Sequence, residues 1–169
     1  MMADTVTANQ LLLARFVVIV AGVLVGLGLF WYGFSTEVLS RIGRNILERP
    51  GGPMTFRFIL QPTMAAIAAF YDGMKDARLN RSPYLWALLT DRNGSTGRLR
   101  EGVIATARII LLGLVMDGIY QAVVLDAFFP AETVLVSILL AFLPYVLLRG
   151  PFCRLARWWA RRRSTGPVS

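Results

Sequence analysis

One apolar run limits the folds open to this chain more than any other feature. Residues 11–34 read LLLARFVVIVAGVLVGLGLFWYGF, and Arg15 is the single charged residue among them. As a helix, these residues reach about 36 Å at ~1.5 Å per residue, which exceeds a hydrocarbon core of about 30 Å. The run therefore predicts a transmembrane helix, and with it an integral membrane protein.

Two further apolar runs follow, at residues 102–128 and 132–148. The segment FPA lies between them, and so short a link requires antiparallel helices because it cannot recross a bilayer. The composition agrees, since 17% of the residues are charged, against about 25% in average soluble domains. The sequence thus predicts an all-α integral membrane protein with three transmembrane helices.

The segment between the first and second runs is more polar and basic. In residues 35–53, four apolar residues recur at helical spacing and two arginines lie off their stripe, which predicts an amphipathic helix at the headgroup level. Residues 58–71 are apolar but too few for an ordinary crossing, so we expect an interfacial or re-entrant helix, with a fourth crossing as the alternative. The stripe in 35–53 consists of Val38, Leu39, Ile42 and Ile46, with Arg41 and Arg44 outside it.

The distribution of Lys and Arg predicts the orientation, because short loops rich in these residues stay in the cytoplasm. Residues 35–101 hold ten of the eighteen Lys and Arg residues, and the segment from Arg149 onward holds six. We therefore expect the N-terminus outside and the C-terminus inside a bacterial inner (cytoplasmic) membrane, and a fourth crossing is rejected because it would strand basic residues outside. The expected parts are 1–34 (N-terminal segment and first transmembrane helix), 35–101 (basic cytoplasmic region with amphipathic or re-entrant helices), 102–149 (transmembrane hairpin) and 150–169 (basic cytoplasmic tail).

Asp117 is a carboxylate within the second apolar run, where an isolated charge costs several kcal/mol. Counted from the short link, Asp117 is expected at the same depth in the membrane as Leu143, which is followed by Pro144 and Tyr145. Pro144 has no amide proton and leaves the Leu140 carbonyl without its helical donor. A protonated Asp117 is expected to bond that carbonyl or the Tyr145 hydroxyl, so that Asp117→Asn preserves folding. A proton or cation site and a subunit contact are the alternatives.

Other polar residues and glycines lie within the apolar runs. Tyr120 is a further polar residue near Asp117, and Arg108 is expected to snorkel to the cytoplasmic interface. Arg15 and Asp126 are expected to be neighbours at the outer boundary. Gly22 and Gly26 have GxxxG spacing and Gly33 shares their stripe, which predicts close packing on a helix of this chain or of a second copy. The alternative is that glycine is simply frequent in membrane helices.

Basic and aromatic residues near the membrane boundary indicate contact with anionic lipid headgroups, because indole rings and cations suit that interface. Nucleic acid is not an expected partner. The expected contacts are self-association, or contact with other membrane proteins, through the first helix. The chain has no histidine and one cysteine, Cys153, so no metal site or cofactor is expected. The expected headgroup contacts are Arg41, Arg44, Arg154, Arg157, Trp158, Trp159 and Arg161.

The function expected from these features is that of a non-enzymatic accessory or scaffolding component. One alternative is a small oligomeric transporter or an ion or proton pathway that uses Asp117. The other is a lipid-modifying enzyme with Asp72 and Asp76 at the headgroup level. The segment around Asp72 partly matches the CDP-alcohol phosphotransferase signature, but Ala69 stands where that signature needs an aspartate.

About half of the chain resembles small, uncharacterised bacterial inner-membrane proteins, in the segments FRFILQPTMAAIAAFYDGMKDAR and MDGIYQAVVLDAFFPAETVLVSILLAFLPYVLLRGPFCRLARWW. The resemblance implies a location in that membrane, and no activity comes with it. The features that carry it are Gln61-Pro62, Asp76-Ala77-Arg78, Asp117, Tyr120-Gln121, Pro130 and Leu148-Arg149-Gly150-Pro151.

Overall fold

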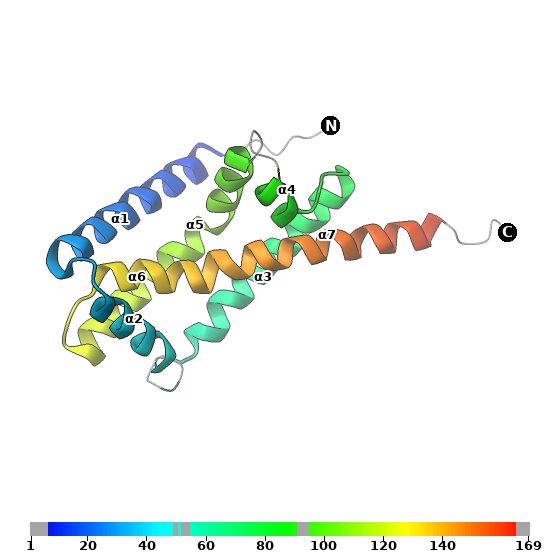
Figure 1. Cartoon of the computed structure of the whole chain (residues 1–169). Coiled ribbons are helices and arrows are strands. Elements are labelled where there is room, and N and C mark those ends of the chain that lie inside the picture. Colours follow the sequence, from blue (N-terminus) through cyan, green and yellow to red (C-terminus); the bar gives the residue numbers. More distant parts are fainter. Residues whose placement is uncertain (1–6, 49–50, 52–54, 91–94, 165–169) are drawn as a thin grey trace.

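A computed structural model describes residues 7–48, 51, 55–90 and 95–164. Every regular element in these ranges is helical (Figure 1). Three helical stretches are long and apolar enough to cross a membrane, at Ala8–Tyr32, Ser95–Leu125 and Pro130–Arg162, as the three apolar runs predict. The elements are α1 (Ala8–Tyr32), α2 (Thr36–Glu48), α3 (Arg57–Arg78), α4 (Tyr84–Thr90), α5 (Ser95–Tyr120), π-helical η2 (Gln121–Leu125), α6 (Pro130–Ser137), π-helical η3 (Ile138–Phe142) and α7 (Leu143–Ser164).

The ends of α1 follow from local side-chain and backbone chemistry. The Thr7 N–H donates to Gln10 Oε1 at 3.1 Å, which satisfies a backbone group at the start of the helix. At the other end Gly33 has a φ of 65°, and its N–H donates to the Leu29 carbonyl at 2.9 Å. A glycine accepts this backbone conformation without a Cβ clash. Gly33 therefore ends α1 and lies outside the helical stripe on which it was expected.

α1 runs in the same direction as α5, the first arm of the hairpin (Figure 1). Leu11 near the start of α1 shares a groove with Val103 near the start of α5. At the far end of α1, the Tyr32 hydroxyl donates to the Phe128 carbonyl at 3.0 Å. α1 and α5 are therefore parallel neighbours.

α3 is a continuous helix of 22 residues, longer than the apolar segment 58–71 for which an interfacial or re-entrant helix was expected. It packs along η3 and α7, and its small residues Ala65 and Ala69 are fully buried there. A Cβ on Gly73 would lie 2.9 Å from the Arg149 carbonyl oxygen, so the two backbones approach closely at this point. The length of this helix was underestimated because its charged residues interrupt the apolar sequence.

The hairpin has the expected antiparallel arms but a different register. The first arm ends at Leu125, Asp126 follows with a φ of 48°, and Pro130 begins α6. The link therefore starts earlier than the segment FPA. A Cβ on Gly113 would lie 2.9 Å from Ser137 Oγ, and Gln121 binds both Asp117 and Thr133. Asp117 therefore lies level with Thr133 instead of Leu143, and about 12 Å from the end of η2 at ~1.5 Å per residue.

Gly28 marks the close contact of α1 with the hairpin. A Cβ on Gly28 would lie 2.6 Å from the Ala131 Cβ, whereas nothing lies within 4 Å of such an atom on Gly26. We expect Gly28→Ala to lower the free energy of unfolding by about 1–3 kcal/mol through overpacking. The matched change Gly26→Ala should be neutral or stabilising by up to about 1 kcal/mol, because alanine favours helix. Denaturant titration in detergent micelles compares the two, and equal effects would contradict this contact.

Candidate functional site

Three clusters of side chains, each built around a buried carboxylate, lie inside the described part of the chain. Each centres on a carboxylate and takes its cation from a different helix. The Asp76 cluster consists of Asp72, Asp76, Tyr84, Arg98, Glu101, Tyr145 and Arg149. The Asp117 cluster consists of Arg57, Gln61, Asp117, Tyr120, Gln121 and Thr133. The Glu132 cluster consists of Tyr32, Arg41, Asn45, Phe129 and Glu132.

Arg149 is the main cation of the Asp76 cluster and is fully buried. Its Nε donates to Asp76 Oδ2 at 2.8 Å and its Nη2 to Asp76 Oδ1 at 3.1 Å, which is the two-point geometry that arginine forms with a carboxylate. Its Nη2 also donates to Glu101 Oε1 at 2.8 Å, and its Nη1 to the Tyr145 hydroxyl at 2.5 Å. The Tyr145 hydroxyl in turn donates to Asp72 Oδ2 at 2.6 Å. This network joins α3, α5 and α7.

Arg98 and Tyr84 complete this cluster from the α4–α5 side. Arg98 Nη1 lies 3.1 Å from Asp76 Oδ1, so Asp76 is bound by two arginines. The Tyr84 hydroxyl donates to the Arg98 carbonyl at 2.7 Å, and the Arg149 guanidinium lies 4.3 Å from the Tyr84 ring centroid. Burial raises the pKa of Tyr84 to about 12. Tyr84 therefore remains a neutral hydrogen-bond donor at all ordinary pH values.

The Asp117 cluster joins α3 to the hairpin near its turn. Arg57 Nη1 donates to Asp117 Oδ1 at 2.8 Å, and these side chains are 1% and 0% exposed. Gln121 Nε2 donates to Asp117 Oδ2 at 2.7 Å and to Thr133 Oγ1 at 3.1 Å. The Phe129 N–H donates to Gln121 Oε1 at 2.6 Å, so the same amide also fixes the hairpin link.

Part of the Asp117 cluster has unused hydrogen-bonding capacity. Arg57 Nε, Arg57 Nη2 and Gln61 Oε1 are buried without a hydrogen-bond partner among the described residues. The guanidinium lies 4.7 Å from the Tyr120 ring centroid, and that face of the cation therefore contacts an aromatic ring. A buried polar atom without a hydrogen-bond partner is energetically costly. Among the described residues, Arg57 and Gln61 are the two neighbouring side chains that both have such atoms.

The Glu132 cluster fastens α2 to the hairpin. Glu132 is 1% exposed, and Asn45 Nδ2 donates to its two oxygens at 3.1 and 3.0 Å. Arg41 Nε lies 3.6 Å from Glu132 Oε1, and its guanidinium lies 4.2 Å from the Phe129 ring centroid. Arg41, which was expected at lipid headgroups, is 30% exposed and also pairs with Glu132.

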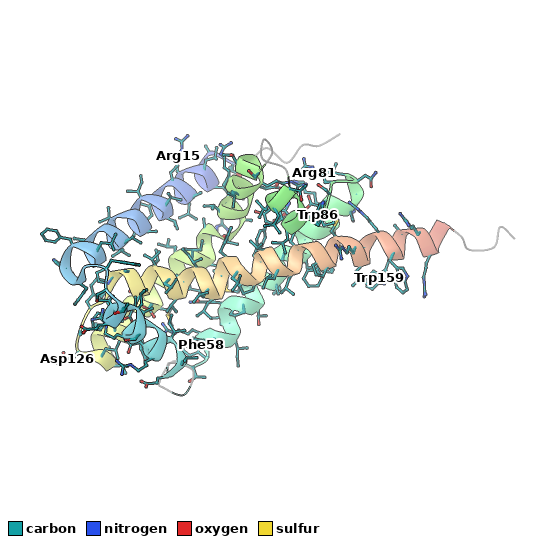
Figure 2. The ribbon with its side chains drawn as sticks, viewed as in Figure 1. Arg15, Phe58, Arg81, Trp86, Asp126 and Trp159 are labelled. Carbon is teal, nitrogen blue, oxygen red and sulfur yellow. The ribbon has the colours of Figure 1, made fainter. Side chains whose placement is uncertain are left out.

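Several residues expected to act together are apart. Tyr145 contacts Asp72 and Arg149 instead of Asp117. Pro144 is the second residue after the π-helical segment η3, where its missing amide proton helps to explain the irregular helix. Arg15 lies near the start of α1 and Asp126 at the far end of the α5 arm, so the structure does not bring them together (Figure 2).

Most of the remaining expected residues lie on the outside of the bundle. Nothing of the described chain lies within 4 Å of a Cβ on Gly22 or Gly26. Arg108 is exposed on α5 and Arg44 on α2. On the last turns of α7, which extend beyond the other helices in Figure 1, Arg154, Trp158 and Trp159 are exposed, Arg157 donates to the Arg81 carbonyl, and Arg161 borders a groove with Arg78.

Sequence reasoning missed Arg57, Glu132 and Arg149 as members of buried ion pairs. Arg57 lies 60 residues from Asp117, and Arg149 lies 73 residues from Asp76. One local signal was available, because Arg57 and Gln61 are four residues apart and therefore share a helical face. No family model, curated protein or solved structure matches the chain.

Proposed function

We propose that the protein is a non-enzymatic accessory or scaffolding component of a membrane, and that it acts by binding a transmembrane helix of another protein along α1. The observation that carries the proposal is the pairing of the three central buried carboxylates. Asp76, Asp117 and Glu132 are each bound by an arginine of the same chain. Carboxylates held in this way stabilise the helix arrangement and are not free for proton transfer or substrate binding.

α1 is the element that the bundle covers least. In its most apolar 18 residues 17% are buried, against 44% for each of the other two long apolar stretches. Its packed face contains Ala14, Val17 and Gly28, whereas Gly22 and Gly26 point away from that face. Small residues at this spacing let a second helix approach closely within a lipid environment. We therefore assign the partner helix to the Gly22–Gly26 face.

The partner helix can be tested with bulky residues on that face. Gly22→Leu/Gly26→Leu should abolish a larger complex seen for the wild type by native electrophoresis of mildly solubilised membranes. The matched variant Phe16→Leu/Val23→Leu changes exposed positions of α1 that lie farther from that face and should retain the complex. Leucine is a good helix former, so α1 itself should persist. A complex that survives in the double-glycine variant, or a wild-type chain that migrates alone, would contradict the proposal.

We further propose that α1, α3, α5 and the α6–α7 arm all cross the membrane, with both termini in the cytoplasm. Because α1 and α5 run parallel, we place their N-termini on the same side of the membrane. α3 has 22 residues, enough for about 33 Å. Of the cations that this places toward the outer end, Arg41 and Arg57 have carboxylate partners, whereas Arg44 is exposed. Most other Lys and Arg residues then lie inside, as orientation by charge requires.

Impermeant maleimide labelling of intact cells distinguishes the two orientations. We expect Phe34→Cys to be labelled and Thr7→Cys to be protected until the cells are permeabilised. An outside N-terminus with three crossings gives the opposite pattern at both positions. The native Cys153 is fully buried and should stay unlabelled in both variants, so it need not be removed.

A second candidate is a proton or ion pathway through Asp117, and the unused polar atoms of Arg57 and Gln61 favour it. Wild-type protein in vesicles would then carry a proton or cation flux that Arg57→Gln alters. Absence of flux in vesicles that contain folded protein removes this candidate. A lipid-modifying enzyme has less support, because Asp76 is fully buried between two arginines.

A further inference from the structure

A groove of about 370 Å³ lies between the N-terminal halves of α1 and α5. Its walls are almost entirely aliphatic, and its two charged residues, Arg15 and Arg100, are both cationic. No acidic residue of the described part of the chain lines it. The lining residues are Leu11, Ala14, Arg15, Val18, Ile19, Arg100, Val103 and Ile104.

The two arginines differ from the buried arginines of the bundle. Both are exposed, and neither forms an ion pair with the described residues. Arg98, two residues before Arg100, turns inward to Asp76 and is neutralised there. The groove therefore combines an apolar surface with two cations whose charge the described chain does not use.

The position of the arginines along their helices matches a headgroup level. Arg15 lies about 11 Å from the start of α1 and Arg100 about 8 Å from the start of α5, at ~1.5 Å per residue. Long arginine side chains can extend from such positions toward the interface, and the guanidinium fork suits a phosphate. We propose that this groove holds one anionic phospholipid, with its phosphate on Arg15 and Arg100 and an acyl chain against Val18, Val103 and Ile104. The proposal rests on membrane residence but not on the partner helix at Gly22 and Gly26.

A second groove, at the other end of α1, provides a comparison within the same molecule. It is also largely apolar, and its arginine is Arg41. That cation already contacts Glu132 and lies over the Phe129 ring. Because its charge is used, this groove lacks the charge complementarity that the Arg15–Arg100 groove offers to an anionic phosphate.

Native mass spectrometry of the full chain, with phosphatidylglycerol or phosphatidylcholine added in defined amounts, tests the site. The wild type should retain one phosphatidylglycerol with at least a tenfold preference over phosphatidylcholine. Arg15→Gln/Arg100→Gln should lose that preference, while Arg78→Gln/Arg154→Gln, which removes the same charge from exposed positions elsewhere, should keep it. Val18→Trp should expel the lipid by filling the groove, whereas Val23→Trp, at an exposed position outside it, should not.

The outcomes separate this proposal from its competitors. Equal retention of the two lipids, or equal loss in both arginine variants, would overturn it. Displacement of phosphatidylglycerol by millimolar inorganic phosphate would show a site for free phosphate instead, and a lipid-free dimer that Val18→Trp dissociates would show a second copy in the groove. We expect the Gly22→Leu/Gly26→Leu variant to retain the lipid, since that variant tests only the partner helix.

Discussion

Asp76→Asn is expected to lower the free energy of unfolding by about 3–5 kcal/mol, the range for removing one partner of a buried ion pair. Asp76 is fully buried and accepts bonds from Arg149 at 2.8 and 3.1 Å and from Arg98 at 3.1 Å. An asparagine has nearly the same shape but no charge, so two arginines lose their shared counter-ion. Glu101 and Tyr145 still contact Arg149 and limit the loss.

Denaturant titration of the micellar protein, followed by circular dichroism, measures this effect. Asp126→Asn is the matched control, because it makes the same chemical change at an exposed residue. Asparagine also tolerates the φ of 48° found at that position. The control should change stability by less than about 0.5 kcal/mol. Similar values for the two variants would mean that the Asp76 cluster does not hold α3 against α5 and α7.

Length and hydropathy predicted the three long apolar helices, because a run that exceeds the hydrocarbon thickness has few other solutions. The antiparallel hairpin also followed from the length of its link. The register of the hairpin did not follow, since the first arm ends at Asp126 through a positive φ and both arms contain a π-helical segment. These backbone details shift Asp117 by about ten residues relative to the second arm, from Leu143 to Thr133.

α3 was harder to predict because its charges oppose the apolar pattern. Arg57, Gln61 and Asp76 lie on its buried face together with Ala65 and Ala69. Read alone, such residues place a helix at the membrane surface. Their partners lie 60 and 73 residues away, and a local reading of the sequence contains no information on that pairing. The same limit applies to α1, where the GxxxG spacing indicates a close-packing face but the bundle uses Gly28 instead.

Asp117→Asn should destabilise the protein by about 3–5 kcal/mol, because it leaves the buried Arg57 cation without its carboxylate. A protonated Asp117 without a charged partner would instead predict a nearly neutral substitution. Arg57→Gln should cost less than Asp117→Asn, because Gln121 still binds the Asp117 carboxylate at 2.7 Å.

The double variant Arg57→Gln/Asp117→Asn makes the argument quantitative. It replaces an ion pair by two amides, so neither charge remains buried alone, and its cost should fall short of the summed single effects by about 0.5–3 kcal/mol. A cycle that pairs Asp117→Asn with Arg108→Gln, an exposed arginine on the same helix, should be additive. The difference between the two cycles isolates the contact of α3 with α5. If both cycles are additive, the arginine that balances Asp117 is not Arg57, and α3 lacks the contact that anchors its N-terminal end in the bundle.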